Sequence, residues 1–374
     1  MKSDRSAALA LISAAIIGLV IANSPLGPGF MQFKSSYFGI ESIGLKLSVD
    51  HWVSDLFLAV FFLVAGLELK YELRLGVLSK PSTALVPILG AIGGVILPAL
   101  IYVAMNYDGE YLRGWPIPTA TDIAFALGIL AIFGRGLPKS ARIFLLALAI
   151  FDDLVAILII AVFFTNDLQP LWLVIAGAIA VAFVFTERSA KLPHNLIRVL
   201  VFFALWYSVL QSGVHATIAG VLMGLLIPAR KAHGLVNRIQ PLTNSVVLPL
   251  FAFFAVAIML PRFSGSFSSV FTGIAIALPV GKIVGITLFA VIANRIAKPA
   301  ARLPLQSLDF VAVGALAGVG FSVSLLMTSL AFQSEPLILA EATLAVILGS
   351  IVSMSLGAWL AQARGRHYLK LKNH

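Results

Sequence analysis

The sequence contains no cysteine and few charged residues. Only 11% of its 374 residues are Asp, Glu, Lys or Arg, whereas 60% are hydrophobic and the mean hydropathy is +1.02. Without cysteine the chain can form neither a disulfide nor a thiolate metal site, although this absence does not select a cellular compartment. Apolar runs recur along the whole chain, and they indicate an integral membrane protein with many spans.

Long polar segments are also missing, which excludes a separate soluble domain. The longest break between apolar runs covers about residues 24–51, and alternating residue types over residues 37–47 predict a small β-hairpin there. A hairpin outside the membrane would offer a contact surface to a second copy of the chain. A homodimer is therefore one expectation, and an irregular surface loop is the alternative.

The apolar windows predict an all-α membrane protein with about twelve transmembrane helices in a single integral membrane domain, residues 1–374. The first window, with its basic start, also fits a cleavable signal peptide, but its apolar run is long for one, and we interpret it as the first span. The predicted spans lie near residues 7–23, 52–69, 84–104, 119–134, 143–165, 170–186, 196–210, 213–227, 244–260, 270–293, 309–330 and 337–361.

The 26 Lys and Arg residues outnumber the 16 Asp and Glu residues, so the formal net charge is +10. Such an excess indicates nucleic-acid binding when the basic residues gather on one surface. Here most of them fall in loops that the span count places on the cytoplasmic side, and the positive-inside rule then puts both termini in the cytoplasm. We expect membrane lipid, and no nucleic acid, as a partner. The exceptions are Lys34, Lys46, Arg113 and Arg262 on the outside and Lys282 within a span.

Asp152 and Asp153 stand side by side in the middle of an otherwise apolar stretch, residues 143–164. A helix of about 20 apolar residues crosses a bilayer, so both carboxylates lie near its midplane. Each aspartate costs about 2.5–3.5 kcal/mol there, and aspartates tolerated at this depth usually face a path for ions or protons. Neighbouring residues of a helix diverge by about 100°, which favours distinct roles over a symmetric pair. The stretch indicates a transport site.

The span at residues 119–134 is expected to begin with irregular backbone. Pro116 and Pro118 precede Thr121 and Asp122 in the run WPIPTATDIAFALG. Proline lacks an amide donor and disfavours helix in the residue before it, so carbonyl and hydroxyl oxygens near this point are candidate cation ligands. An ordinary helix start capped by a threonine or an aspartate is the alternative.

The span at residues 309–330 has glycines in its centre, followed by two serines. Close helix packing through small residues is one interpretation of this pattern. An interrupted helix is the other, because this span and the span at 119–134 are the middle members of two sets of three. The residues concerned are Gly314, Gly318, Gly320, Ser322 and Ser324.

Interruptions at corresponding positions suggest an inverted repeat of about residues 84–165 and 270–361. Interrupted helices leave positive amino ends and negative carboxyl ends inside the membrane. We expect Asp122 to balance the amino ends and Lys282, which lies in the apolar run IAIALPVGKIVGITL, to balance the carboxyl ends.

The chain contains, in order, the segments FFLVAGLELKYEL, TATDIAFALG, LAIFDDLVAI, SGVHATIAGV, LPLFAF, PVGKIVGI and AGVGFSVSL. Together they resemble the NhaA-type sodium/proton antiporters over essentially the whole chain. This family is itself an example of the inverted-repeat transporters, so the repeat and the resemblance are not independent inferences. The resemblance implies an NhaA-like fold in which two interrupted helices cross.

The resemblance also implies roles for the polar residues. Asp153 would be the principal ligand of Na⁺ or Li⁺ and a proton carrier, Asp152 would pair with Lys282, and Thr121 and Asp122 would belong to the crossing chains. Hard cations prefer carboxylate, carbonyl and hydroxyl oxygens, and two close carboxylates raise each other's proton affinity. The same oxygens can therefore hold either a cation or a proton.

The implied function is exchange of intracellular Na⁺ or Li⁺ for external H⁺ across a bacterial inner membrane, for sodium and pH homeostasis. Neither a cofactor nor enzymatic activity is expected, since the transported ions are the only ligands needed. If Lys282 loses a proton when a cation breaks its pair with Asp152, more than one proton moves per cation, and exchange is electrogenic.

Asp55, Glu68, Glu72 and His215 are further candidates, for an entry funnel or for regulation. Asp55 also fits a carboxylate that benefits from a helix start, and the two glutamates fit a solvated charge network. His215 also fits a hydrogen-bonding packing residue.

The sequence departs from the family pattern at the cytoplasmic rim. A basic residue is frequent where Tyr71 stands, and titratable groups are frequent where Val236, Asn237 and Gln240 stand. Strong pH gating is therefore not expected, whereas proton coupling is.

Three other functions compete with exchange. An intramembrane aspartyl protease needs two aspartates face to face around one water, which adjacent residues of one helix cannot provide. A passive cation channel needs rings of oxygens and no coupled carboxylate and lysine. A sodium symporter of similar inverted-repeat build needs an organic-substrate site, and the sequence has no second polar cluster large enough for one.

Overall fold

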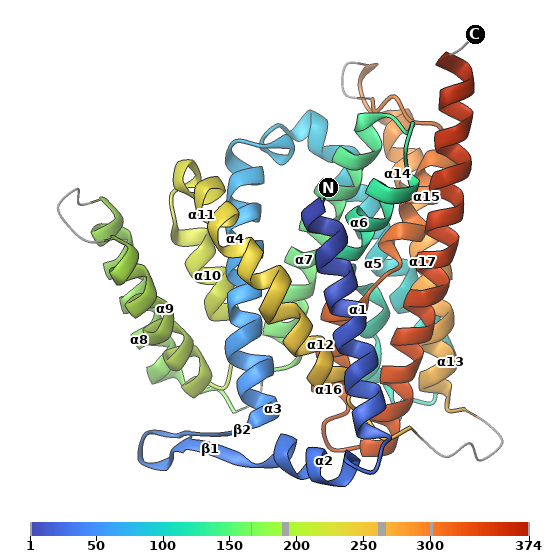
Figure 1. Ribbon diagram of the computed structural model, residues 1–374. Coiled ribbons are helices and arrows are strands. Elements are labelled where there is room, and N and C mark those ends of the chain that lie inside the picture. Colours follow the sequence, from blue (N-terminus) through green and yellow to red (C-terminus); the bar gives the residue numbers. More distant parts are fainter. Residues whose placement is uncertain (1, 166, 189–193, 261–266, 300–301, 373–374) are drawn as a thin grey trace. The chain divides into compact units, whose positions relative to one another are not determined.

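The structure is a computed structural model that describes residues 2–165, 167–188, 194–260, 267–299 and 302–372. Arg262, which the span count places outside the membrane, lies outside the described residues. The described part of the chain is helical except for turns, links and one short β-hairpin (Figure 1). The predicted all-α class is confirmed.

Contacts between residues divide the chain into two compact units. Unit 1 consists of Met1–Ala10, Val77–Ala156 and Ile258–His374, and unit 2 consists of Leu11–Gly76 and Ile157–Ala257. The helices α1 (Lys2–Ala22) and α7 (Lys139–Phe163) contribute to both units. Both segments of the expected inverted repeat belong mainly to unit 1. The repeat itself, and the organisation as a single transporter domain, stay predictions.

Unit 1 consists of helices linked by short turns. A π-helical turn, Ala277–Gly281, joins α13 to α14 at a point where Pro279 cannot donate an amide hydrogen bond. The 3₁₀ turns of unit 1 are Val77–Ser79, Leu112–Gly114 and Ile117–Thr119. Its helices, besides parts of α1 and α7, are α5 (Pro81–Met105), α6 (Ile123–Phe133), α13 (Ser269–Ile276), α14 (Lys282–Ile296), α15 (Ser307–Ala317), α16 (Phe321–Ala331) and α17 (Pro336–Lys372).

The helices α5 and α14 pack backbone to backbone within unit 1. A Cβ atom at Gly93 would collide with the carbonyl oxygen of Gly285, and a Cβ atom at Gly285 would collide with that of Gly93. Small residues at such contacts let membrane helices approach closely enough for van der Waals packing to hold them together. Because Lys282 is the first residue of α14, this contact fixes the helix that carries it.

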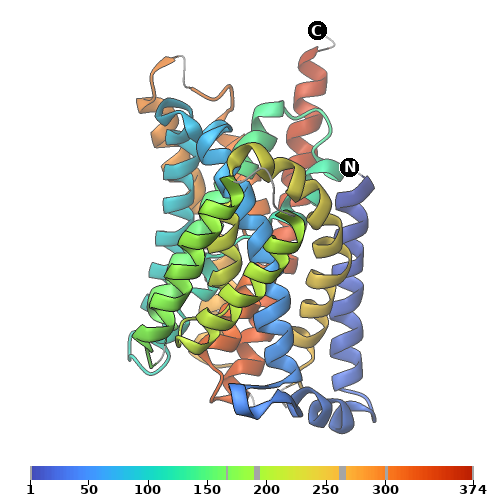
Figure 2. The ribbon, with the colours of Figure 1, turned by 90° about the vertical axis from the view of Figure 1, so that its left-hand side faces the viewer.

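Unit 2 is also helical, and α8 and α9 lie side by side in it, drawn in green in Figure 2. The first span bends by 109° between α1 and the short α2. Two π-helical turns, Trp52–Phe57 and Thr243–Val247, precede α4 and α12. Its helices, besides parts of α1 and α7, are α2 (Gly27–Ser35), α3 (Val49–His51), α4 (Leu58–Arg74), α8 (Pro170–Arg188), α9 (His194–Gln211), α10 (Ile218–Leu226), α11 (Ala229–Leu242) and α12 (Leu248–Val256).

The predicted hairpin is present in unit 2. Its strands β1 (Tyr37–Ile40) and β2 (Leu45–Ser48) are antiparallel, with Tyr37 opposite Ser48 and Ile40 opposite Leu45. The turn Glu41–Ile43 ends at Gly44, whose φ of 69° is a left-handed conformation that favours glycine. All of β1 is exposed.

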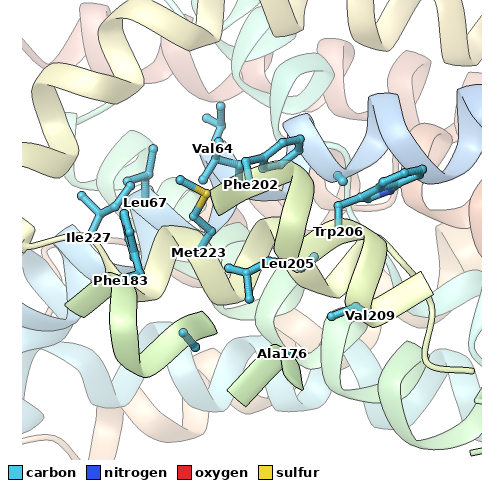
Figure 3. Close-up of a cluster of buried hydrophobic side chains, with 14 of the residues drawn as sticks. Val64, Leu67, Ala176, Phe183, Phe202, Leu205, Trp206, Val209, Met223 and Ile227 are labelled. Carbon is cyan, nitrogen blue, oxygen red and sulfur yellow. The ribbon is translucent and has the colours of Figure 1, made fainter. Parts of the chain in front are cut away.

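A cluster of apolar side chains forms the core of unit 2 (Figure 3). Leu67 comes from α4, Phe183 from α8, Trp206 from α9 and Met223 from α10, and all four are almost completely buried. Glycine lets α4 and α10 touch, since a Cβ atom at Gly220 would collide with the backbone of α4.

Fewer helices are long enough to cross a membrane than the twelve spans predicted from the sequence, among the residues that the structure describes. Among the described residues eight helices are long and apolar enough to cross a membrane, or ten if each of two bent pairs is one span. The other two predicted spans coincide with α9, whose searched stretch Asn195–Gln211 is shorter than 18 residues, and with α10, which has 9 residues. The count of twelve therefore stays a prediction.

Candidate functional site

Both expected interruptions are present in unit 1. Before α6 the chain forms the 3₁₀ turn Ile117–Thr119 and then leaves the helical conformation at Ala120–Asp122. The helices α15 and α16 are separated by residues 318–320, and their axes differ by 50°. Proline in the first run and glycine in the second permit these breaks, as the sequence predicted.

The two interruptions contact each other. The amide of Asp122 donates to the carbonyl oxygen of Val319 at 2.6 Å, and the Ser324 hydroxyl donates to the carbonyl oxygen of Ile117 at 2.6 Å. A Cβ atom at Gly320 would lie 3.0 Å from the carbonyl oxygen of Ala120, so glycine avoids a tight contact at this approach. The expected crossing of the two chains is confirmed.

Asp122 joins the amino ends of two helices. One carboxylate oxygen accepts from the amides of Ala124 and Phe125 at 3.1 and 3.3 Å, in the first turn of α6. The other accepts from the amide and the hydroxyl of Ser322 at 3.2 and 2.5 Å, in the first turn of α16. Two positive helix ends therefore surround a carboxylate that is 5% exposed, which is the charge balance expected from the sequence.

Lys282 is linked to a carboxyl end. Its ammonium group donates to Asp152 Oδ2 at 2.6 Å and to Thr121 Oγ1 at 3.0 Å, and its side chain is wholly buried. The Thr121 hydroxyl in turn donates to the carbonyl oxygen of Ala317, the last residue of α15, at 2.7 Å. The positive charge thus reaches the negative end of α15 through one hydroxyl group.

Asp152 and Asp153 are buried on α7, at 2% and 5% exposure. Asp152 forms the ion pair with Lys282, and its second oxygen, Oδ1, has no hydrogen-bond partner in the part of the chain that the structure describes. Asp153 lies near enough for its charge to act on Lys282.

Two buried carboxylates, Asp152 and Asp153, lie near the ammonium group of Lys282. Carboxylate oxygens are hard ligands that suit a proton or a monovalent cation. Asp153 and Asp152 Oδ1 are therefore the candidate oxygens for such an ion.

Asp55 and His215 lie together in unit 2. Asp55 is in the π-helical turn before α4, and its Oδ1 is 3.5 Å from His215 Nε2. His215 Nδ1 lies 2.8 Å from the Thr217 hydroxyl, and the Asp55 carbonyl oxygen accepts from the Trp206 indole at 3.1 Å. Asp55 and His215 thus lie within contact distance of each other, a pairing that their separation by 160 positions hides from sequence analysis.

Glu68 and Glu72 lie one turn apart on α4, also in unit 2. Glu68 Oε1 accepts from the Gln240 side chain at 3.3 Å, and the Tyr71 ring lies 5.4 Å from the His233 ring. His233 is a titratable group at this rim that the sequence reading missed. The spacing along α11 could have indicated this residue. Residues seven apart on a helix share a face, and Gln240 follows His233 at that distance.

Residues 1–360 match the family model described as Na+/H+ antiporter 1. The chain belongs to this antiporter family. The relatives bear the name NhaA, and the resemblance of the seven segments is thereby confirmed. Membership also makes the chain a member of a family of transporters rather than of enzymes.

Three relatives match this chain over nearly its whole length. A Na(+)/H(+) antiporter NhaA 2 of Clavibacter michiganensis subsp. michiganensis is 45% identical over 375 residues, 98% of this chain and 92% of the relative. A Na(+)/H(+) antiporter NhaA of Thermobifida fusca is 40% identical over 395 residues, which cover 100% of this chain and 95% of the relative. One of Escherichia coli O139:H28 is 41% identical over 375 residues, 96% of each chain.

Proposed function

We propose that this protein exchanges Na⁺ or Li⁺ for H⁺ across a bacterial inner membrane. The observation that carries the proposal is the buried pair of Lys282 and Asp152 with a second carboxylate, Asp153, beside it. The names of the relatives support the same activity. A sodium symporter and an intramembrane protease find no support in the family or in the arrangement of the carboxylates.

Exchange follows if protons and cations compete for the same oxygens. In the proton-loaded form, a proton occupies a carboxylate of Asp152 or Asp153. In the cation-loaded form, Na⁺ takes that place, with carboxylate oxygens as its hard ligands. Because the empty site has two buried carboxylates in the ionised form, its reorientation is disfavoured, and each half of the cycle proceeds loaded.

Asp153 is the proposed principal ligand and proton carrier, and Asp152 the residue that alternates between Lys282 and the cation. When a cation draws Asp152 away, Lys282 loses the partner that stabilises its ammonium form and releases a proton. More than one proton then moves for each cation, which makes the exchange electrogenic. Thr121 and Asp122 maintain the crossing and the charges of the helix ends.

The remaining expectations belong to the same proposal. Both termini lie in the cytoplasm, the exposed strand β1 contributes to a homodimer, and the activity serves sodium and pH homeostasis. Asp55, Glu68, Glu72 and His215 act on entry or regulation, rather than on the exchange step itself. No resident cofactor or metal takes part, because the transported ions supply the chemistry.

The test is dissipation of a proton gradient in everted membrane vesicles on addition of Na⁺, Li⁺ or K⁺. We expect Na⁺ and Li⁺ to collapse the gradient with the unaltered protein and not with Asp153→Ala. Asp108→Asn, which changes an exposed carboxylate in the loop after α5, is the matched control and should behave as the unaltered protein. A gradient that no cation alters from mildly acidic to alkaline pH would contradict exchange and favour a symporter.

A further inference from the structure

A second buried ion pair lies in unit 1, and ion exchange as proposed above does not use it. Arg364 Nε donates to Asp309 Oδ1 at 2.8 Å, with the arginine side chain 10% exposed and the aspartate side chain fully buried. Arg364 belongs to α17 and Asp309 to the first turn of α15. The pair therefore joins the C-terminal helix to the amino end of α15. This is the end of the interrupted helix that is farther from the interruption.

Further hydrogen bonds make this junction rigid. Asp309 Oδ2 accepts from the Tyr368 hydroxyl at 2.6 Å and from the backbone amide of Gln306 at 2.8 Å. Arg364 Nη2 donates to Gln306 Oε1 at 2.6 Å. Because Arg364 and Tyr368 are four residues apart, they lie on one face of α17. Both form hydrogen bonds with the N-terminal capping box of α15.

The same turn of α17 also touches the chain that leaves α6. A Cβ atom at Gly365 would collide with the carbonyl oxygen of Arg135, just after α6 ends. Gly136, whose φ is 99°, lies against the backbone of Gly365 in return. Arg364, Gly365 and Tyr368, here named the α17 clamp, therefore contact the amino end of α15 and the chain just after α6 (Figure 1 shows α17 in red).

The inner ends of these two helices carry the ion site. The last residue of α15, Ala317, accepts the hydrogen bond of Thr121, and α6 starts immediately after Asp122. Eight residues separate Asp309 from Ala317, which corresponds to about 12 Å of rigid helix. Hydrogen bonds depend on donor–acceptor distance and on angle, so an axial shift of either helix would disturb the links to Lys282 and Asp122.

A buried ion pair is a poor source of stability, because removing two charges from water costs about as much as their attraction returns. Its best-attested benefit is that it fixes one register, since only one arrangement pairs both charges. The planar guanidinium group adds to this, because it holds Asp309 and Gln306 at once in a fixed fork.

We propose that the α17 clamp sets the cation affinity of the exchange site by fixing the positions of α6 and α15. Arg364, Asp309 and Tyr368 are positioning residues in this account, and they do not touch the transported ion. The inference rests on the proposed exchange function, which it deepens by assigning a role to the C-terminal helix.

The test compares full-length variants in proteoliposomes. Arg364→Lys keeps the charge but cannot reproduce the fork, and Asp309→Leu combined with Arg364→Met removes both charges without leaving one unpaired. We expect both to raise the apparent KM for Na⁺ by roughly three- to tenfold, the size of coupling that distant positions exert, with the maximal rate within about twofold. Arg366→Lys, an exposed neighbour on the same turn, is the control.

A purely structural role gives a different result. The melting temperature of Arg364→Lys in detergent would then be lower, while the apparent KM of its folded fraction for Na⁺ would equal that of the unaltered protein. This result would overturn the clamp proposal. The rise of melting temperature with added Na⁺ is a second readout of affinity that needs no exchange.

These two readouts separate the two proposals. If the unaltered protein binds Na⁺ but does not exchange it, the exchange proposal fails. The clamp proposal is then tested by the Na⁺ concentration that is needed to raise the melting temperature. If this concentration is the same for the clamp variants and for the control variant, the clamp proposal is refuted. If the unaltered protein shows neither exchange nor stabilisation by Na⁺, both proposals are wrong.

Discussion

Lys282 and Asp152 form an ion pair with an Nζ to Oδ2 distance of 2.6 Å, and neither side chain is more than 1% exposed. Lys282 comes from α14 and Asp152 from α7, so the pair joins two spans in the centre of unit 1. The second oxygen of Asp152 has no partner among the described residues. One oxygen of the paired carboxylate thus makes no hydrogen bond there, and in the proposed cycle this carboxylate leaves Lys282 to bind the cation.

Removing the charge of Lys282 should affect both stability and coupling. Lys282→Ala leaves Asp152 buried without its partner, and we expect a loss of about 3–5 kcal/mol in the free energy of unfolding. The double variant Lys282→Ala and Asp152→Asn should recover a large part of this loss. Thermal melting of the purified proteins gives the comparison. A single variant as stable as the unaltered protein would show that the pair is not ionised.

Lys282→Arg provides the matched test of coupling. Arginine keeps the positive charge but does not release its proton in proteins, so the coupled proton should be lost. We expect exchange that no longer responds to an imposed membrane potential, whereas exchange by the unaltered protein should. Sodium uptake into proteoliposomes at several potassium diffusion potentials measures this. A voltage response that survives in Lys282→Arg would contradict the proposed release of a proton from Lys282.

Truncation of the two aspartates of α7 should have unequal effects. Asp153→Ala should abolish exchange, because it removes both oxygens of the proposed principal ligand, whereas Asp152→Asn keeps an oxygen ligand and should leave slow or altered exchange. Initial rates of sodium-dependent proton movement in vesicles, normalised to the amount of protein in the membrane, give the answer. Equal and mild losses in both variants would refute the distinct roles.

Much of this site could be predicted from sequence because its chemistry is costly. Charges at Asp152 and Lys282 within apolar runs, prolines just before one span and glycines in the centre of another each violate a strong local rule. Those violations located the interruptions and the charge balance at Asp122. The hairpin around Gly44 could be predicted because its sequence follows a local rule instead of violating one. Alternating residue types and turn residues are local signals of a hairpin.

Contacts between distant polar residues could not be predicted. Asp309 reads as an ordinary first-turn carboxylate, and Arg364 reads as a cytoplasmic basic residue, so nothing in the sequence indicates that they meet. The pairing of Asp55 with His215 was hidden in the same way. Such partners are chosen by the packing of helices, for which one sequence holds no direct signal.

The crossing of the interrupted chains makes a steric prediction at Gly320. A methyl group there would lie 3.0 Å from the carbonyl oxygen of Ala120 and would also press on the Ser324 hydroxyl, so Gly320→Ala must push the two chains apart. We expect reduced exchange and a melting temperature lower by several degrees, since about 1–3 kcal/mol is typical of overpacking. Gly177→Ala, where a methyl group meets nothing within 4 Å, is the matched control. Equal behaviour of both variants would show that the chains do not need their close approach.

Competition between protons and cations predicts how the apparent affinity for Na⁺ depends on pH. As pH falls, protons occupy the carboxylates Asp153 and Asp152 more often, so the apparent KM for Na⁺ should rise. If one proton must leave before a cation binds, the limit of this rise is about tenfold per pH unit, and two coupled protons make it steeper. The measurement is the exchange rate against Na⁺ concentration at several pH values, with the pH equal on both sides of the membrane. The maximal rate at saturating Na⁺ should change less than the KM, because excess cation displaces the protons. A KM that stays constant while the maximal rate falls with pH would mean that protons act at a separate site, and the shared-site mechanism would then be wrong.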